Sequence, residues 1–426
     1  MTKTFSIKTL GCKLNQYDSS LIAGYFQENG WKAARFGEPA DVVIINTCTV
    51  TDRSDKKCRN LIRQGARHSR SGGVIVTGCM VDADRSGILS MPEVLAVFSN
   101  REKDLIFEKI NSQIIEPALH ADTVMIQHDT APLPFGHTRG YLKIQDGCDN
   151  SCSYCIIPSV RGKGRSRPFV EILDHGKKLI DSGCPEIILT GITTGGYSCD
   201  GKTLPDVVEA LAELEGQFRI RITSIEPVHV TSHLIELFSH KKVCSHIHLP
   251  IQSGSDKILE RMNRPYSLPV YMDIIEKIKE KHPDIAIGTD IIIGFPGEED
   301  VDFQGSLDAI HNCGYSYLHQ FSFSARTGTP AASMGNRPSQ KIIAERSLVM
   351  RTLSEKISSA YRKRFIGIPL ECVIEKNRNN GIFTAVSSNY IKLTLMDSPE
   401  NEKKRGTLSM VTLNRTEPEQ SFGTLL

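Results

Sequence analysis

The sequence predicts an α/β protein built from three parts, and three observations lead to this expectation. The chain has 426 residues, which is too long for one ordinary domain. Strand-like segments alternate with helix-like segments up to about residue 353, and this alternation favours parallel sheets. Farther along the chain, short apolar segments occur without helices between them. We therefore expect three domains, at residues 1–135, 136–358 and 359–426.

The composition is that of a globular protein, with 39% hydrophobic and 23% charged residues. No apolar stretch is long enough to span a membrane, and the N-terminus lacks the apolar segment of a signal peptide. The 12 cysteines therefore indicate metal or redox chemistry in a reducing cytoplasm rather than disulfides. A net charge of +2 excludes a protein that binds polyanions over its whole surface, so any nucleic-acid contact must come from local basic patches.

The first 135 residues alternate between strands and helices in the manner of a parallel sheet. Strands are expected at Phe5–Thr9, Val42–Ile45 and Val74–Val76, and helices at Ser19–Asn29 and Asp52–His68.

Each of these three strands runs into a loop that carries a cysteine, namely Cys12, Cys48 or Cys79. In an open parallel sheet the carboxyl ends of the strands lie along one edge, where ligands bind. Three cysteines just past three strand ends are therefore expected to converge at one site. The alternative is three unrelated buried thiols, which are common for this residue type.

The central region contains six β/α units and predicts an open partial barrel, (β/α)6. The expected strands are Gly140–Gln145, Glu186–Leu189, Arg219–Ser224, His246–Leu249, Ile285–Ile293 and Tyr315–Phe323. The expected helices include Glu171–Asp181, Pro205–Leu214, Asp256–Met262, Tyr271–Lys281 and Asp302–His311. Chemistry in such barrels takes place at the C-terminal ends of the strands.

Three cysteines follow the first barrel strand with the spacing C-x3-C-x2-C, at Cys148, Cys152 and Cys155. This spacing supplies three thiolates, whereas structural zinc sites and ordinary iron–sulfur sites have four protein ligands. A cluster held by three thiolates leaves one iron open to a substrate or cofactor. The alternatives are a zinc site without its fourth ligand and three free thiols. Zinc motifs usually have a second Cys/His pair at loop spacing, and none follows here, so the cluster interpretation is favoured.

The last part of the chain predicts a small antiparallel β-barrel. Leu370–Glu375 and Tyr390–Leu395 are strand-like, and residues 377–381 are expected to form a turn. Basic runs at Arg362–Arg364 and Lys403–Arg405 accompany these strands. Two interpretations remain open for this module, a structural cap and an RNA-binding barrel.

The Cys148 triplet resembles that of the radical S-adenosylmethionine (SAM) enzymes, and the two cysteine sets together resemble the methylthiotransferases. The resemblance covers essentially the whole chain and rests on Gly11–Ser19, Asn46–Thr51, Thr77–Cys79 and the triplet itself. It implies a flavodoxin-like first domain, a central barrel of the radical-SAM type and a C-terminal TRAM module. It also implies two [4Fe-4S] clusters. An auxiliary cluster would bind Cys12, Cys48 and Cys79, and the cluster that chelates SAM would bind Cys148, Cys152 and Cys155.

The family has branches that differ in substrate. One modifies isopentenyladenosine in tRNA, one modifies N6-threonylcarbamoyladenosine in tRNA, and one modifies an aspartate of a ribosomal protein. The chain resembles the threonylcarbamoyladenosine branch at residues 11–16, 46–51, 223–227, 248–256 and 262–266. Glu226 stands where histidine is expected in the isopentenyl branch, and Lys13 stands where the ribosomal branch typically has proline.

Seven further residues are expected to contact SAM. Tyr154 lies between Cys152 and Cys155, where the superfamily usually places an aromatic side chain near the adenine. The others lie at or near the ends of barrel strands: Thr190, Gly191, Gln252, Ser253, Thr289 and Asp290. Ordinary capping of strand ends is the alternative for each of them. The arginines of the run Arg161–Arg167 are expected to contact RNA phosphates or the methionine carboxylate.

The resemblance predicts an enzyme that adds a methylthio group to C2 of N6-threonylcarbamoyladenosine at position 37 of the tRNA anticodon loop. No catalytic side chain is expected beyond the cluster ligands. The expected partners are the tRNA anticodon stem-loop and a reducing electron donor such as flavodoxin or ferredoxin, with the protein a monomer. The alternatives are methylthiolation of isopentenyladenosine or of a ribosomal-protein aspartate, and a non-catalytic iron–sulfur protein that binds RNA or senses redox state.

Overall fold

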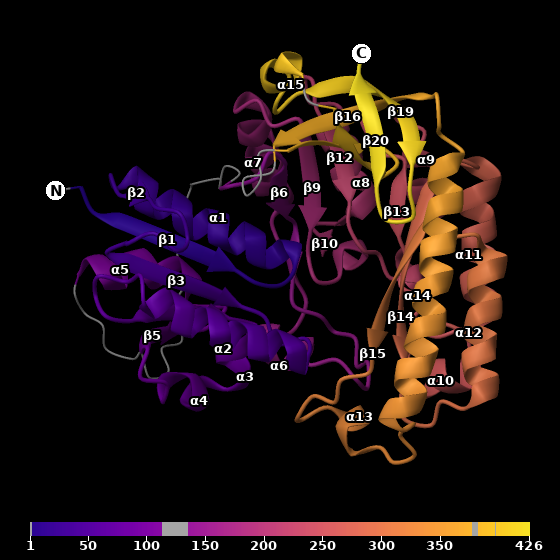
Figure 1. Cartoon of the computed structure of the whole chain (residues 1–426), viewed down its shortest axis with the longest axis horizontal. Coiled ribbons are helices and arrows are strands. Elements are labelled where there is room, and N and C mark those ends of the chain that lie inside the picture. The colour runs from indigo at the N-terminus through magenta and orange to yellow at the C-terminus, as the bar shows by residue number, and fades with distance from the viewer. Residues whose placement is uncertain (1, 113–134, 377–381, 397) are drawn as a thin grey trace.

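The structure is a computed structural model that describes residues 2–112, 135–376, 382–396 and 398–426. The N-terminal domain lies beside a central half-barrel, and a C-terminal β-barrel sits at one end of the half-barrel (Figure 1). The three predicted fold types are confirmed, whereas the turn predicted at residues 377–381 lies outside the described residues.

The N-terminal domain has a five-stranded parallel sheet in the order β2-β1-β3-β4-β5, which is the flavodoxin-like order. The strands are β1 (Thr4–Thr9), β2 (Lys32–Ala33), β3 (Val42–Thr47), β4 (Val74–Gly78) and β5 (Val94–Phe98). The three predicted strands are confirmed, and β2 and β5 extend the sheet at its two edges. Separate apolar clusters cover the two faces, one around Phe26 and Ile44 and the other around Ile45 and Val76.

Short helices connect these strands. They are α1 (Lys13–Glu28), α2 (Asp52–Ala66), α3 (Cys79–Ala83), α4 (Arg85–Leu89) and α5 (Ile106–Asn111), with a 3-10 turn η1 (Lys103–Leu105). Helix α1 begins at Lys13 rather than at the predicted Ser19. Its first turns carry buried polar side chains, because the Asn15 amide donates to the carbonyls of Leu10 (2.8 Å) and Thr47 (2.9 Å). The apolar periodicity that marks a helix in sequence is therefore missing there.

The central region is an open barrel of six parallel strands. They are β6 (Gly140–Lys143), β9 (Glu186–Thr190), β12 (Arg219–Ile222), β13 (His246–His248), β14 (Ala286–Ile293) and β15 (Tyr317–Ser322). The first three form one sheet and the last three another, and the parallel bridges Ile220–Val243 and Ser224–His248 join the two. All six predicted strands are confirmed; five are shorter than predicted, and β9 extends one residue farther, to Thr190.

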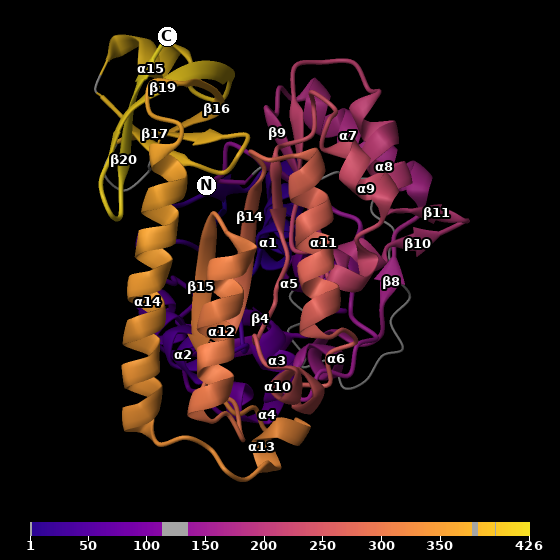
Figure 2. The ribbon, with the colours of Figure 1, turned by 90° about the vertical axis from the view of Figure 1, so that its right-hand side faces the viewer.

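Helices cover the outer face of the half-barrel. The main ones are α7 (Phe169–Asp181), α8 (Leu204–Ala212), α9 (Ser232–Leu237), α10 (Asp256–Arg261), α11 (Leu268–Lys281), α12 (Asp300–Cys313) and α14 (Gln340–Lys363). A small hairpin follows the first barrel strand. It consists of β7 (Gln145–Asp146) and β8 (Arg165–Ser166), and α6 (Ile157–Arg161) lies between these two strands in the chain. The remaining small elements are β10 (Ser198–Cys199), β11 (Lys202–Thr203) and α13 (Pro330–Ser333). Figure 2 shows α14 running along the half-barrel to the C-terminal module.

The C-terminal module is a closed five-stranded barrel. Its strands are β16 (Pro369–Lys376), β17 (Phe383–Ser387), β18 (Lys392–Leu395), β19 (Leu408–Thr416) and β20 (Ser421–Leu425), with α15 (Pro399–Lys403) between β18 and β19. Four of the pairings are antiparallel, as predicted, but β18 pairs with β20 in parallel. This exception arises because β19 crosses over between them and closes the barrel in the order β16-β17-β18-β20-β19.

Buried charges join the C-terminal barrel to the half-barrel. Glu186 on β9 is fully buried and accepts hydrogen bonds from Arg219 (2.8 Å) and Arg221 (2.8 and 2.9 Å) on β12. The same guanidinium groups donate to backbone carbonyls of the C-terminal barrel, with Arg219 reaching Val386 (2.7 Å) and Arg221 reaching Ser387 (2.9 Å). The adjacent arginines hold the pKa of Glu186 well below its ordinary value. The arginines therefore link a strand of one domain to the carbonyls of the next.

Replacing Glu186 with Gln is expected to destabilise this junction strongly. The substitution leaves the buried guanidinium groups of Arg219 and Arg221 without their shared carboxylate, and breaking a buried pair in this way costs about 3–5 kcal/mol. Denaturant unfolding followed by circular dichroism measures the loss. The matched control is Asp273→Asn, which removes the exposed pair with Lys277 and should change stability by less than about 1 kcal/mol. Equal effects of the two substitutions would contradict a structural role for Glu186.

Candidate functional site

Cys12, Cys48 and Cys79 lie together at the carboxyl edge of the N-terminal sheet. Cys12 precedes α1, Cys48 follows β3, and Cys79 opens α3. The thiol of Cys48 lies within electrostatic range of both Cys12 and Cys79. The structure thus brings together three residues that are far apart in sequence, as the strand-end argument predicted.

Two glycines allow this close approach. Gly11 has a φ of +111°, and a Cβ at this position would lie 2.9 Å from the Cβ of Cys48. Gly78 has a φ of +99°, and a Cβ there would lie 2.4 Å from the carbonyl oxygen of Thr47. Any other residue at either position would force the cysteine loops apart, because L residues rarely adopt this conformation and the space is already filled.

A fourth thiol, Cys58, lies behind this site. Its Sγ accepts from the N–H of Cys48 (3.4 Å) and donates to the carbonyl of the same residue (3.3 Å). Burial raises the pKa of Cys48 to about 11 and that of Cys58 to about 12. Both thiols are therefore protonated at neutral pH unless a metal displaces the proton. The Sγ of Cys58 already forms two hydrogen bonds with the backbone of Cys48.

Cys148, Cys152 and Cys155 lie in the loop between β7 and α6. Burial raises the pKa of Cys155 to about 12, and the thiols of Cys148 and Cys152 add to this effect. Two side chains donate hydrogen bonds to the set: the Thr193 hydroxyl reaches the Sγ of Cys148 (3.1 Å), and the Arg264 guanidinium reaches the Sγ of Cys152 (3.0 Å). Donors of this kind favour the thiolate form, and at Cys152 the Arg264 guanidinium opposes burial, which still raises the pKa of that thiol.

The spacing of the sulfur atoms distinguishes between possible metals. Among the described residues, in neither cysteine set do the three sulfur atoms all lie within 4.8 Å of one another. Thiolates on one tetrahedral zinc ion are about 3.8 Å apart, given a Zn–S bond of about 2.3 Å. A cluster of several iron atoms holds its thiolates farther apart. Neither set is therefore arranged to hold a single zinc ion.

The first residues expected to contact SAM lie close to the Cys148 set. Tyr154 is half-buried, packs edge-on against Phe295 with ring centroids 6.4 Å apart, and accepts a hydrogen bond from Arg264 (3.4 Å). Thr190 ends β9, and its carbonyl accepts from Ile144 (3.0 Å). At Gly191 a Cβ would lie 3.0 Å from the carbonyl oxygen of Gln145, so this glycine allows two strand-end loops to touch.

The remaining four residues lie at β13 and β14. Gln252 has a φ of +65°, and Ser253 is buried with its hydroxyl accepting from the N–H of Ser255 (3.2 Å). The Thr289 hydroxyl donates to the carbonyl of Leu249 (2.7 Å) and accepts from Ile251 (2.9 Å). This hydroxyl therefore bridges β14 and the segment after β13, as expected if Thr289 caps a strand end and does not contact SAM.

Asp290 forms a third arrangement, because one carboxylate oxygen accepts from both His248 (3.1 Å) and His319 (3.2 Å). These imidazoles hold the pKa of Asp290 below its ordinary value against the effect of burial. The carboxylate therefore orients two histidines on the inner face of the half-barrel.

Sequence reasoning missed two groups that organise the site. Gln145 accepts from the backbone of Thr193 (2.8 Å) and donates to the carbonyl of Gly147 (2.7 Å), so it links the loops after β7 and β9. Arg264 forms an ion pair with Glu226 while it contacts Cys152. Both Arg264 and Glu226 fall in motifs that indicated the family branch, but only the fold shows that they meet.

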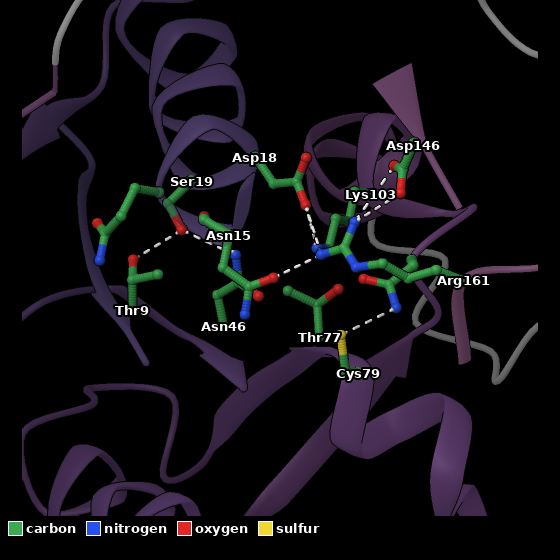
Figure 3. A network of polar contacts seen from close by, with 12 residues as sticks. Thr9, Asn15, Asp18, Ser19, Asn46, Thr77, Cys79, Lys103, Asp146 and Arg161 are labelled. Atoms are coloured by element: carbon green, nitrogen blue, oxygen red, sulfur yellow. Dashed lines mark hydrogen bonds and ion pairs between the residues drawn. The ribbon is translucent and has the colours of Figure 1, made fainter. Parts of the chain in front are cut away.

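Arg161 connects the two cysteine sets. It is 3% exposed and donates to Asp146 (3.1 Å), Asn15 (2.6 Å) and Asp18 (3.4 Å), as Figure 3 shows. Lys103 also pairs with Asp18 (2.5 Å). The expectation that Arg161 contacts RNA or methionine is therefore wrong. Its side chain lies inside the junction between the N-terminal domain and the half-barrel.

Two further contacts strengthen this junction. Cys79 packs against Ile156 and Val160, and Ile156 is the residue after Cys155. On the far side of the half-barrel, Arg326 donates to Asp52 (2.7 Å) and Asp55 (2.7 Å) of α2.

Comparison with known proteins agrees with this architecture. The Radical SAM superfamily model matches residues 142–310, and the model described as Uncharacterized protein family UPF0004 matches residues 4–99. The threonylcarbamoyladenosine tRNA methylthiotransferase MtaB of Bacillus subtilis is 36% identical over 92% of this chain and 90% of its own length. The MtaB protein of Chlamydia pneumoniae is 34% identical over 99% and 98%. A tRNA-2-methylthio-N(6)-dimethylallyladenosine synthase of Zymomonas mobilis is 30% identical over 100% and 97%.

The chain belongs to the radical SAM methylthiotransferase family. Enzymes of this family transfer a sulfur-containing group. Among solved structures, the radical SAM methyltransferase TsrM from Kitasatospora setae aligns with a TM-score of 0.56, covering 78% of this chain and 77% of its own. At 11% identity this likeness concerns the fold alone. None of the described helices has the length and apolar character to cross a lipid bilayer.

Anaerobically reconstituted protein is expected to hold about eight iron atoms, and Cys48→Ala should reduce this to about four. The matched control is Cys58→Ala, which removes a thiol that lies beside Cys48 but already bonds to the backbone. This control should keep about eight iron atoms. Iron and sulfide analysis measures both. A loss of iron in the Cys58 variant equal to that in the Cys48 variant would show that the wrong thiols have been assigned.

Proposed function

We propose that this chain adds a methylthio group to C2 of N6-threonylcarbamoyladenosine at position 37 of the tRNA anticodon loop. The observation that carries the proposal is the near-full-length similarity, at 36% and 34% identity, to two proteins named for this activity. The two sets of three cysteines support it, because the reaction requires two kinds of chemistry at one adenine.

The first requirement is a radical. The hydrogen on C2 is neither acidic nor attached to an electrophilic carbon, so acid–base catalysis cannot remove it. We assign a SAM-binding [4Fe-4S] cluster to Cys148, Cys152 and Cys155 and an auxiliary one to Cys12, Cys48 and Cys79. When bound, these clusters supply reductive cleavage of SAM to a 5′-deoxyadenosyl radical and a site for the transferred sulfur.

The side chains around the Cys148 set bind and position. Arg264 donates to Cys152 and Tyr154, and its charge is neutralised by the ion pair with Glu226. The Cys152 sulfur therefore has a fixed hydrogen-bond donor, and the Arg264–Glu226 pair adds no net charge to the site. The SAM contacts assigned to this chain are Tyr154, Thr190, Gly191, Gln252, Ser253 and Asp290. The buried hydroxyl of Thr289 instead keeps β13 and β14 in register.

The proposed partners follow from the reaction. The substrate is the anticodon stem-loop, and a reducing protein such as flavodoxin or ferredoxin supplies electrons to a monomeric enzyme in the cytoplasm. The C-terminal barrel is the proposed RNA-binding module. Its residues Lys403, Lys404 and Arg405 are all exposed, in contrast to the buried Arg161.

Methylthiolation of dimethylallyladenosine is the second candidate, because a protein with that name is 30% identical over the whole chain. Two stem-loop RNAs that differ only in the N6 substituent separate the two candidates. Incubation with SAM and reductant, followed by mass spectrometry of the nucleosides, should give a methylthio product from the threonylcarbamoyl RNA. A product from the dimethylallyl RNA alone would overturn the proposal, and absence of 5′-deoxyadenosine would favour a non-catalytic protein.

The two cysteine sets should fail differently when mutated. Cys48→Ala is expected to retain reductive cleavage of SAM to 5′-deoxyadenosine but to form no methylthio product, because the Cys148 set remains intact. Cys155→Ala should lose both activities, since no radical is then made. Liquid chromatography of 5′-deoxyadenosine together with nucleoside mass spectrometry distinguishes them. Normal methylthiolated product from the Cys48 variant would contradict the assignment of the sulfur site.

The basic run of the C-terminal barrel should contribute to RNA affinity. Replacing Lys403, Lys404 and Arg405 with Gln is expected to weaken stem-loop binding and to reduce the slope of log K against log salt by about 2, if each cation contacts one phosphate. The control replaces three exposed lysines outside the barrel, Lys241, Lys277 and Lys281, with Gln. An unchanged slope in the barrel variant would indicate that the barrel is a structural cap.

A further inference from the structure

Lys13, at the start of α1, has no ion-pair or hydrogen-bond partner within the described part of the chain. It follows Cys12 and is half-buried. Its electrostatic neighbours are Tyr390 of the C-terminal barrel and Arg221, Arg139 and Glu186 of the half-barrel, and burial lowers the pKa of its ammonium group. Among the described residues, none forms a hydrogen bond or an ion pair with its ammonium group. All three domains therefore meet around an unpaired positive charge.

The surrounding charges do not offset this one. Arg139 pairs with Glu186 (3.2 Å) and Glu375 (2.9 Å), and the remaining arginines of the cluster share Glu186 and an exposed glutamate, Glu371. Three arginines thus meet three carboxylates, and Lys13 adds positive charge in excess, as does Lys392, whose ammonium lies 5.9 Å from the centre of the Tyr390 ring. A positive site surrounded by low-dielectric protein attracts an anion more strongly than one in water.

A strained aromatic residue lies in the same place. Tyr390 has a φ of +64°, which is costly for a bulky residue. Its ring packs against His246 with centroids 4.4 Å apart and the ring planes tilted by 31°, and it lies 5.1 Å from the guanidinium of Arg221. Strain of this kind persists where the surrounding structure holds a side chain in one position, and it is common at ligand sites.

His246 provides a second group without a partner. It is 2% exposed, and its Nε2 contacts the hydroxyl of Tyr317 (2.8 Å), which also contacts Nδ1 of His248 (3.2 Å). The buried Nδ1 of His246 has no hydrogen-bond partner in residues 2–112, 135–376, 382–396 and 398–426. In one tautomer this nitrogen accepts and in the other it donates. A hydroxyl can satisfy it in either case, because a hydroxyl both donates and accepts.

We propose that Lys13 and His246 recognise the N6 substituent of the substrate adenosine, with the Lys13 ammonium binding its carboxylate and Nδ1 of His246 its hydroxyl. This assignment rests on the proposed function and adds the groups that select the substrate. A threonylcarbamoyl group carries both a carboxylate and a hydroxyl, whereas a dimethylallyl group carries neither. A dimethylallyl substituent would leave both protein groups unpaired in a buried site, and such unpaired groups are the strongest source of discrimination against an analogue.

The test uses full-length protein and stem-loop RNAs that differ only at position 37. They carry threonylcarbamoyladenosine, its analogue with the carboxylate converted to a carboxamide, or unmodified adenosine. Wild-type protein should bind the carboxylate RNA about 10-fold or more tightly than the carboxamide RNA. Lys13→Met should bind these two RNAs equally and should keep its affinity for the unmodified RNA within about twofold. The control Lys8→Met, which changes an exposed lysine of β1, should retain the wild-type preference.

The hydroxyl is tested in the same way. An RNA whose substituent lacks the hydroxyl should bind wild-type protein about 3- to 10-fold more weakly than the threonylcarbamoyl RNA. His246→Phe retains a ring to stack on Tyr390 but should lose this preference. A preference retained by the variant would remove His246 from the assignment.

The outcomes separate this inference from the proposed function. If wild-type protein methylthiolates the threonylcarbamoyl RNA but binds the carboxamide RNA equally well, or if Lys13→Met keeps the wild-type preference, the assignment of Lys13 is wrong and the function stands. If wild-type protein binds with the expected preference but forms no methylthio product, the function is wrong and the anion site stands. If Lys13→Met fails to fold, as circular dichroism would report, the comparison of the two RNAs on wild-type protein decides.

Discussion

The buried guanidinium of Arg161 is the interaction on which the geometry of the two cysteine sets depends. It lies at the end of α6, directly after the loop of the Cys148 set, and it reaches Asn15 and Asp18 in the helix that begins after Cys12. A buried charge is stable only while its partners stay in place. Neither set can therefore move relative to the other without breaking this network, and Arg326 imposes the same condition on the opposite side through Asp52 and Asp55.

Such rigidity is what a two-centre reaction requires. In the proposed reaction a radical made at one site and a sulfur held at the other must both reach the same adenine within near-contact distance, so small displacements would cost large factors in rate. The chain meets this requirement with packing as well as with charge. Cys79 packs against Ile156, the residue after Cys155, so apolar contact joins the loops that carry the two cysteine sets. Gly11 and Gly78 give the required close approach within the first set.

Much of this arrangement was predictable from the sequence, and the failures have a common physical cause. Strand and helix periodicity predicted the three fold types, and the strand-end rule predicted that Cys12, Cys48 and Cys79 would converge. The start of α1 was placed too late because its first turns bury polar side chains. Arg161 was assigned to ligand contacts because a run of basic residues is usually exposed to solvent. Both errors concern polar residues buried at a junction between domains. Sequence patterns assume that polar means exposed, and that assumption fails where charged groups are paired across an interface.

The inner face of the half-barrel shows how far this principle extends. An ordinary barrel fills its interior with layers of apolar side chains. Here Glu186, Arg219 and Arg221 occupy the layer nearest the C-terminal barrel, and the arginines need carbonyls of Val386 and Ser387 to complete their hydrogen bonds. The C-terminal barrel therefore closes one end of the half-barrel and is not an independent attachment, because its removal would leave the guanidinium groups without partners. An interior that is polar and closed at one end is also suited to receive a polar substituent, which an apolar barrel would exclude because of the cost of removing that substituent from water.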